Sequence, residues 1–127
     1  EFHQFVSNKT AINYIRSFMK RGRKKNSGVC IASQNVEDLL IPEVIAYTKP
    51  LMSIPTHSFL FNPGVNVDPK EFQRNLNVQS HEYKLISQPK QGYCLYKSGI
   101  ERFHLHVIAP PHKEILFGSA GGKGAAA

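Results

Sequence analysis

The chain has 127 residues, of which 41% are hydrophobic and 20% are charged. This composition is typical of a single soluble globular domain and excludes an intrinsically disordered protein. Its formal net charge is +7, which favours a polyanion as partner (nucleic acid, nucleotide phosphate or an anionic membrane surface), although a solvated basic face without a ligand is an equal alternative. No apolar stretch is long enough for a transmembrane helix, and no signal peptide is expected.

The first periodic segment covers residues 10–25, where apolar side chains recur with the spacing of one helix face. Ser7 or Asn8 can cap the start of this helix. The cations of residues 20–25 fall in its last turn, where the helix dipole favours them. Residues 26–28, with the sequence Asn-Ser-Gly, are expected to end the helix.

Residues 29–33 (VCIAS) are apolar without alternation, which predicts a strand buried on both faces of a parallel sheet. A helix that feeds such a strand through a glycine turn is half of a right-handed βαβ unit. Cys30 and Cys94 each lie in an apolar run. We therefore expect two buried free thiols, with a disulfide as the alternative.

The later elements are shorter. They are expected as helices over residues 34–40 and 43–52, a strand over 57–61, helices over 69–76 and 80–87, hairpin strands over 92–96 and 102–108, and a helix over 113–117. Together they predict an α/β fold with a mixed sheet, in which parallel core strands, flanking helices and a C-terminal antiparallel hairpin follow one another. We expect one folded unit over residues 1–118, and a flexible tail or expression remnant over 119–127.

Three groups of polar residues could carry chemistry. Gln34 follows the expected strand at its carboxyl end, where open α/β sheets bind ligands, and its amide could orient a water or sense a γ-phosphate; a loop or capping amide is the alternative. Arg21, Arg23 and Lys24 could reach the nucleotide of a neighbouring subunit, or only complement the helix dipole. Glu1 lies where the second carboxylate of a motor ATPase would be, although a terminal glutamate is usually just exposed.

Other kinds of site are not indicated. The six histidines form no metal-ligand spacing with carboxylates, so no metal site is expected. Neither the serines nor the cysteines show a nucleophile elbow. The sequence contains no GxxxxGK[ST] loop, which is the motif that cradles nucleotide phosphates in P-loop proteins.

Several blocks of the sequence resemble the VirB-type energising ATPases of conjugal transfer and type IV secretion, in the forms found on Gram-positive conjugative elements. The likeness runs over residues 1–3, 18–29 and 31–40, and its specific part is RGRKKNSGV at residues 21–29 with IASQNVEDLL at residues 31–40. It continues over residues 54–57, 59–62, 92–95 and 102–109, so that it covers nearly the whole chain up to about Gly121.

This resemblance implies that the chain is the C-terminal part of a RecA-like P-loop NTPase domain. It also implies a hexamer that uses ATP and Mg²⁺ to power secretion at the cytoplasmic face of the plasma membrane, together with other secretion subunits. In the family pattern, Glu1 matches the second Walker B carboxylate and Gln34 the strand-end glutamine. Arg23 and Lys24 match an RK pair, and Arg102 falls at a later basic position.

The same pattern implies that the chain alone is inactive and holds no cofactor, because the Walker A lysine and the Walker B aspartate are missing from it. A different class of function, a basic DNA-binding or DNA-coupling module of a conjugation or translocation apparatus, remains open, because related translocases share the fold. A third reading is a passive piece that docks on a secretion partner.

Overall fold

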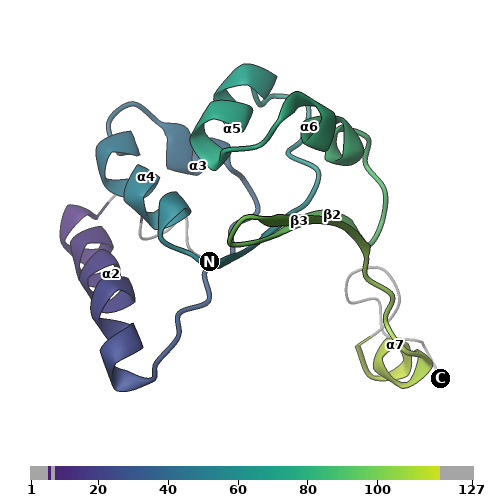
Figure 1. The fold of residues 1–127 in the computed structure, drawn as a ribbon, viewed down its shortest axis with the longest axis horizontal. Helices are drawn as coiled ribbons and strands as arrows, with labels where there is room; N and C mark the ends of the chain where they lie inside the picture. Colours follow the sequence, from purple (N-terminus) through teal and green to yellow (C-terminus); the bar gives the residue numbers. More distant parts are fainter. Residues whose placement is uncertain (1–5, 7, 118–127) are drawn as a thin grey trace.

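The computed structural model describes residue 6 and residues 8–117. Figure 1 shows helices on two sides of a small sheet, with the last helix set apart from the others. None of the helices in the described residues is long and apolar enough to cross a membrane. In chain order the elements are α2 (Lys9–Gly22), η1 (Arg23–Lys25), α3 (Glu37–Leu40), α4 (Ile45–Ser53), β1 (His57–Leu60), α5 (Pro69–Leu76), α6 (Ser80–Ser87), β2 (Tyr93–Ser98), β3 (Glu101–His106) and α7 (Pro111–Phe117).

Helix α2 confirms the predicted first helix and packs beside α4 (Figure 1). The side-chain oxygen of Asn8 accepts a hydrogen bond from the backbone N–H of Ala11 at 3.0 Å, so Asn8 caps the helix. Ile12 of α2 and Leu51 of α4 form the centre of a small apolar core. The chain leaves η1 through Asn26, whose φ of 49° lies in the left-handed region that asparagine tolerates.

The sheet has the order β1-β2-β3 and both of its strand pairs are antiparallel. Helices α5 and α6 lie over one of its faces (Figure 1), and Phe72 and Ile86 from these helices are buried against Leu95 of β2. On the other face Phe59, Tyr96 and Phe103 form one cross-strand row, with ring centroids 4.6 Å and 5.9 Å apart. The predicted hairpin is therefore confirmed.

The two helices over the sheet have the bounds that the sequence predicts, because local signals set them. The Asp68 carboxylate accepts the N–H of Lys70 at 3.0 Å, and proline occupies the first turn of α5. Helix α6 begins where the Glu82 carboxylate accepts the backbone N–H of Gln79 at 2.7 Å. The start of each helix is thus set by residues within its own first turn.

The predicted strand over residues 29–33 is wrong for the described part of the chain. These residues form neither helix nor strand, and none of them shares a backbone hydrogen bond with another described residue. A strand buried on both faces needs a neighbour on each side to pair its N–H and C=O groups. No described segment supplies one, so the parallel core of the expected mixed sheet is not seen, and the described sheet is antiparallel throughout.

The thiol prediction is half right. Both cysteines are free. Cys94 is buried, and this burial raises the pKa of its thiol. Cys30 is exposed, against expectation, because the run that contains it has no neighbouring strand to cover it.

Candidate functional site

The basic residues at the end of α2 form the largest group of candidate site residues. Arg21 lies in the last turn of α2 and Lys24 in η1, and both side chains are exposed. The backbone of Arg23 opens η1 between them. Figure 1 shows this end of α2 well away from α5 and α6. The structure therefore places the exposed side chains of Arg21 and Lys24 near each other at the end of α2, with the backbone of Arg23 between them.

Gln34 lies beyond the far end of the extended run, just before α3, and it is exposed. Residues 29–33 separate Gln34 from the basic turn at η1, so the glutamine and the basic residues do not lie on the same element. Glu1 falls outside the described residues. The roles expected for all of these residues stay predictions.

Arg102 has a structural environment of its own. Its Nη1 donates to the carbonyl oxygens of Gly99 and Glu101, both at 2.9 Å, and its Nε lies 3.6 Å from Oε1 of Glu82. The Glu82 carboxylate is buried and the arginine side chain is only partly exposed. Arg102 thus connects the turn of the β2–β3 hairpin to α6. A role of Arg102 at a subunit boundary stays a prediction.

Lys97 lies beside this ion pair and donates from Nζ to the carbonyl oxygen of Leu76, at the end of α5. Burial lowers the pKa of Lys97, the positive charge of Arg102 lowers it further, and the Glu82 carboxylate opposes both effects. No sequence pattern indicates this cluster, because Glu82 comes from α6 whereas Lys97 and Arg102 come from β2 and β3.

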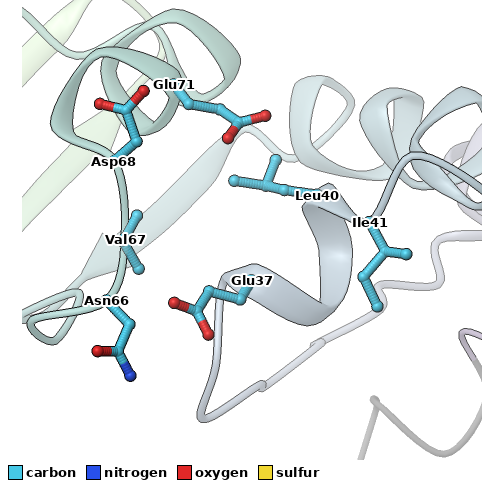
Figure 2. A pocket seen from close by; sticks show the side chains of 7 residues that line it. All are labelled: Glu37, Leu40, Ile41, Asn66, Val67, Asp68 and Glu71. Carbon is cyan, nitrogen blue, oxygen red and sulfur yellow. The ribbon is translucent and has the colours of Figure 1, made fainter.

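The structure adds an acidic cavity that the sequence analysis missed. It has a volume of about 220 Å³ and lies between α3 and the start of α5. Figure 2 shows the Glu37 carboxylate on one side and those of Asp68 and Glu71 on the other. Three carboxylates disfavour a phosphate ligand, and Asp68 is already used as a helix cap. The remaining lining residues are Leu40, Ile41, Asn66 and Val67.

A second cavity, of about 310 Å³, lies between α2 and the segment that follows η1. Tyr14, Ile15 and Phe18 line one wall, and Gly28 and Val29 line the other. The sequence predicts one apolar stripe along α2, but the structure divides it. Its inner side packs into the core, whereas the Tyr14 and Phe18 rings remain exposed.

These residues do not make a complete site for ATP and Mg²⁺. The sequence contains no phosphate-binding loop. Among residue 6 and residues 8–117, no three His, Cys, Asp or Glu side chains lie close enough together to hold a metal ion. No catalytic step is therefore assigned to the described residues.

Comparison with known proteins shows similarity to two type IV secretion proteins. The sequence matches no family model. It is 29% identical over 121 residues to the type IV secretion system protein CagE of Helicobacter pylori (strain ATCC 700392 / 26695), a match that covers 91% of this chain. The structure is similar to that of VirB4 of Thermoanaerobacter pseudethanolicus, with a TM-score of 0.79 and 32% identity over 89% of this chain. The resemblance to the VirB-type family of type IV secretion is confirmed.

The VirB-type match concerns a limited part of each relative. This chain covers 31% of the VirB4 chain and 12% of CagE. The blocks at residues 18–29 and 31–40 include the basic turn and Gln34. The VirB-like chain thus carries several of the candidate residues within a small share of the length of its relatives.

Proposed function

We propose that this chain is part of an ATP-driven motor that energises type IV secretion, including conjugative DNA transfer. The observation that carries the proposal is the similarity to VirB4, at a TM-score of 0.79 and 32% identity over 89% of the chain. The similarity to CagE, a type IV secretion system protein, supports it independently. The whole motor is proposed to be a RecA-like hexamer at the cytoplasmic face of the plasma membrane, working with other secretion subunits.

In this proposal the extended run at residues 29–33 becomes a parallel core strand once further strands lie beside it. Its apolar composition without alternation favours such a position. Gln34 would then lie at the carboxyl end of a sheet strand, where a side-chain amide can orient a water against the γ-phosphate. The chain would need ATP, Mg²⁺ and a phosphate-binding loop from the rest of the motor.

The basic turn would face the nucleotide of an adjacent subunit. Arg21 and Lys24 are exposed at a helix end, and Arg23 lies between them on η1. A guanidinium suits this role because it is always charged and forks onto phosphate oxygens. Glu1 would be the second carboxylate beside the metal-bound water.

The test compares this chain with a longer polypeptide from the same gene that includes any upstream GxxxxGK[ST] loop. We expect ATP hydrolysis by the longer protein and none by the 127-residue chain. Within the longer protein, Gln34→Ala and Arg23→Ala should each lower kcat by about a hundredfold, whereas Arg74→Ala on the exposed face of α5 should not. An encoded loop with no hydrolysis, or hydrolysis unaffected by both changes, would contradict the proposal.

A DNA-binding or DNA-coupling module is the second candidate. One observation favours it: residues 2–36 contain seven Lys and Arg residues and no Asp or Glu, whereas the rest of the chain contains nine of each. The whole formal charge of +7 therefore belongs to one segment. An arginine that acts only on nucleotide needs no such accumulation of charge around it, but a polyanion does.

A further inference from the structure

A stack of side chains lies at one end of the sheet. The rings of Tyr93 on β2 and His106 on β3 are directly opposite each other, parallel to within 10° and with centroids 4.1 Å apart. Nζ of Lys90 also lies 4.1 Å from the centroid of the tyrosine ring. Two groups cannot both lie over one face of a ring at that distance, so Lys90 and His106 cover opposite faces of Tyr93. Because His106 is exposed and Tyr93 is half-buried, the stack ends in an imidazole that a further ring can reach.

The backbone fixes the position of this imidazole. Gly92, with φ of 77°, accepts the N–H of Val107 at 2.8 Å, and this bond extends the hairpin one residue beyond the pair of Tyr93 and His106. A Cβ added at position 92 would lie only 3.3 Å from Cδ2 of His106, so the ring lies against the glycine. The imidazole is therefore held between the backbone and the tyrosine ring, and a ligand would find it already ordered.

Antiparallel pairing places the stack at the carboxyl end of β1. Leu60, the last residue of β1, is opposite Leu95 of β2, and Tyr93 lies two residues further in the direction in which β1 runs. In the proposed motor, β1 and the run at residues 29–33 are parallel strands of one sheet, so the stack and Gln34 lie at the same edge. Open α/β sheets bind nucleotides at this edge, with the phosphates at a helix N-terminus.

We propose that the exposed ring of His106, supported from behind by Tyr93, stacks on the purine base of the nucleotide that the motor hydrolyses. The inference rests on the proposed motor function and deepens it, because Gln34 and the basic turn were assigned only to the phosphate end of the nucleotide. Stacking needs nothing from the base except its π-face, and a purine offers a larger face than a pyrimidine.

The charges around the stack suit a nucleotide. The sequence contains no Asp or Glu over residues 83–100 or over residues 102–113, so no carboxylate of these segments repels a phosphate group. Lys90, by contrast, places an exposed ammonium group on the stack itself. A base that lies on His106 would therefore bring its phosphates into neutral or positive surroundings.

A metal ion fits the same residues less well. His104 and His106 are two residues apart on one strand, and their ring centroids lie 5.3 Å and 4.1 Å from that of Tyr93. A protein zinc site uses at least three protein ligands. Within residue 6 and residues 8–117, no three His, Cys, Asp or Glu side chains are grouped closely enough to hold a metal. The rings of this cluster are thus better suited to stacking than to coordination.

The first experiment separates the base from the phosphates. It uses the longer polypeptide that includes the upstream loop, and isothermal titration calorimetry with two probes, the non-hydrolysable ATP analogue AMP-PNP and inorganic tripolyphosphate, which has no base. His106→Ala should weaken AMP-PNP binding by about tenfold, the loss expected for one stacked base, and leave tripolyphosphate binding unchanged. His106→Phe restores a stacking ring and should retain the affinity for AMP-PNP. The matched control His81→Ala removes an exposed histidine from α6 and should change neither affinity.

The second experiment measures base preference. The parent protein should bind ADP more tightly than CDP, because the purine has the larger stacking area. Tyr93→Ala removes the ring behind His106 and should reduce this preference, whereas Tyr93→Phe should keep it. A stack that only closes the hairpin would change the affinities for ADP and CDP alike. In steady-state kinetics His106→Ala should raise KM for ATP without lowering kcat, because the base makes the same contact in the ground state and the transition state.

Three results would overturn the inference. One is unchanged AMP-PNP affinity in His106→Ala. Another is an equal loss of affinity for AMP-PNP and for tripolyphosphate in that variant. The third is a parent protein that binds tripolyphosphate as tightly as AMP-PNP. Each of these leaves the proposed motor intact, since the phosphates still bind. A longer protein that binds neither probe contradicts the motor itself, and the inference with it, so the two failures are distinguished by the binding of tripolyphosphate to the parent.

Discussion

Nε of Arg102 lies 3.6 Å from Oε1 of Glu82, and this ion pair joins the β2–β3 hairpin to α6. The glutamate is buried and also accepts the N–H of Gln79, so it forms part of the helix cap as well as of the ion pair. One carboxylate therefore connects the start of α6 to the turn of the hairpin. Two stability predictions follow from this cluster.

Arg102→Met should lower the free energy of unfolding by about 1–3 kcal/mol, because it leaves a buried carboxylate without its cation. The matched control Arg74→Met removes an exposed arginine from α5 and should cost less than about 0.5 kcal/mol. Urea unfolding followed by circular dichroism measures both. Equal effects of the two changes would show that the ion pair contributes nothing to stability.

Lys97 should make the stability of the chain rise with pH in the alkaline range. Burial and Arg102 lower its pKa in the folded state, so between that value and the usual lysine value of about 10.4 the unfolded chain binds more protons. The free energy of unfolding then increases with pH through this window. Lys97→Met should flatten this rise, and Lys84→Met, an exposed lysine of α6, should keep it. If Lys97→Met keeps the rise of the free energy of unfolding with pH, Lys97 is not the group that causes it.

Gly92→Ala should destabilise the hairpin more than Gly64→Ala does. Both glycines have positive φ, of 77° and 87°, so alanine is strained at either position. At position 92 an added Cβ would also collide with the carbonyl oxygen of Val107. The two residues are held close together because the Val107 N–H donates a hydrogen bond at 2.8 Å to the carbonyl oxygen of Gly92. No described atom lies within 4 Å at position 64. Melting temperatures of the two variants test this, and a similar decrease in both would assign the cost to backbone conformation alone.

The two thiols should differ in reactivity. Cys30 is exposed and should react with an aromatic disulfide reagent as fast as an unfolded thiol does. Cys94 is buried, and its raised pKa lowers the thiolate fraction, so it should react only as the hairpin opens. Stopped-flow absorbance should show two phases, with Cys30→Ser removing the fast one and Cys94→Ser the slow one. A single fast phase of two thiols would contradict the buried position of Cys94.

Local signals in the sequence determined much of the secondary structure. The cap residues Asn8 and Asp68 act within one turn of their own helices, and so α2 and α5 begin where the sequence predicts. The turn through Gly99, with φ of 58°, likewise lies between two runs of strand-forming residues. The family blocks at residues 18–29 and 31–40 pointed to the secretion proteins that the comparisons then found.

Tertiary structure alone decided which of these elements meet. The ion pair of Glu82 and Arg102, and the hydrogen bond from Thr48 Oγ1 to the carbonyl oxygen of Leu39 at 2.5 Å, join residues whose separation along the chain follows no periodic pattern. The run at residues 29–33 shows the same limit, because apolar composition records a preference for burial but not the presence of a partner strand. Strand pairing is a contact between distant segments, and only the folded chain shows which segments are there to pair.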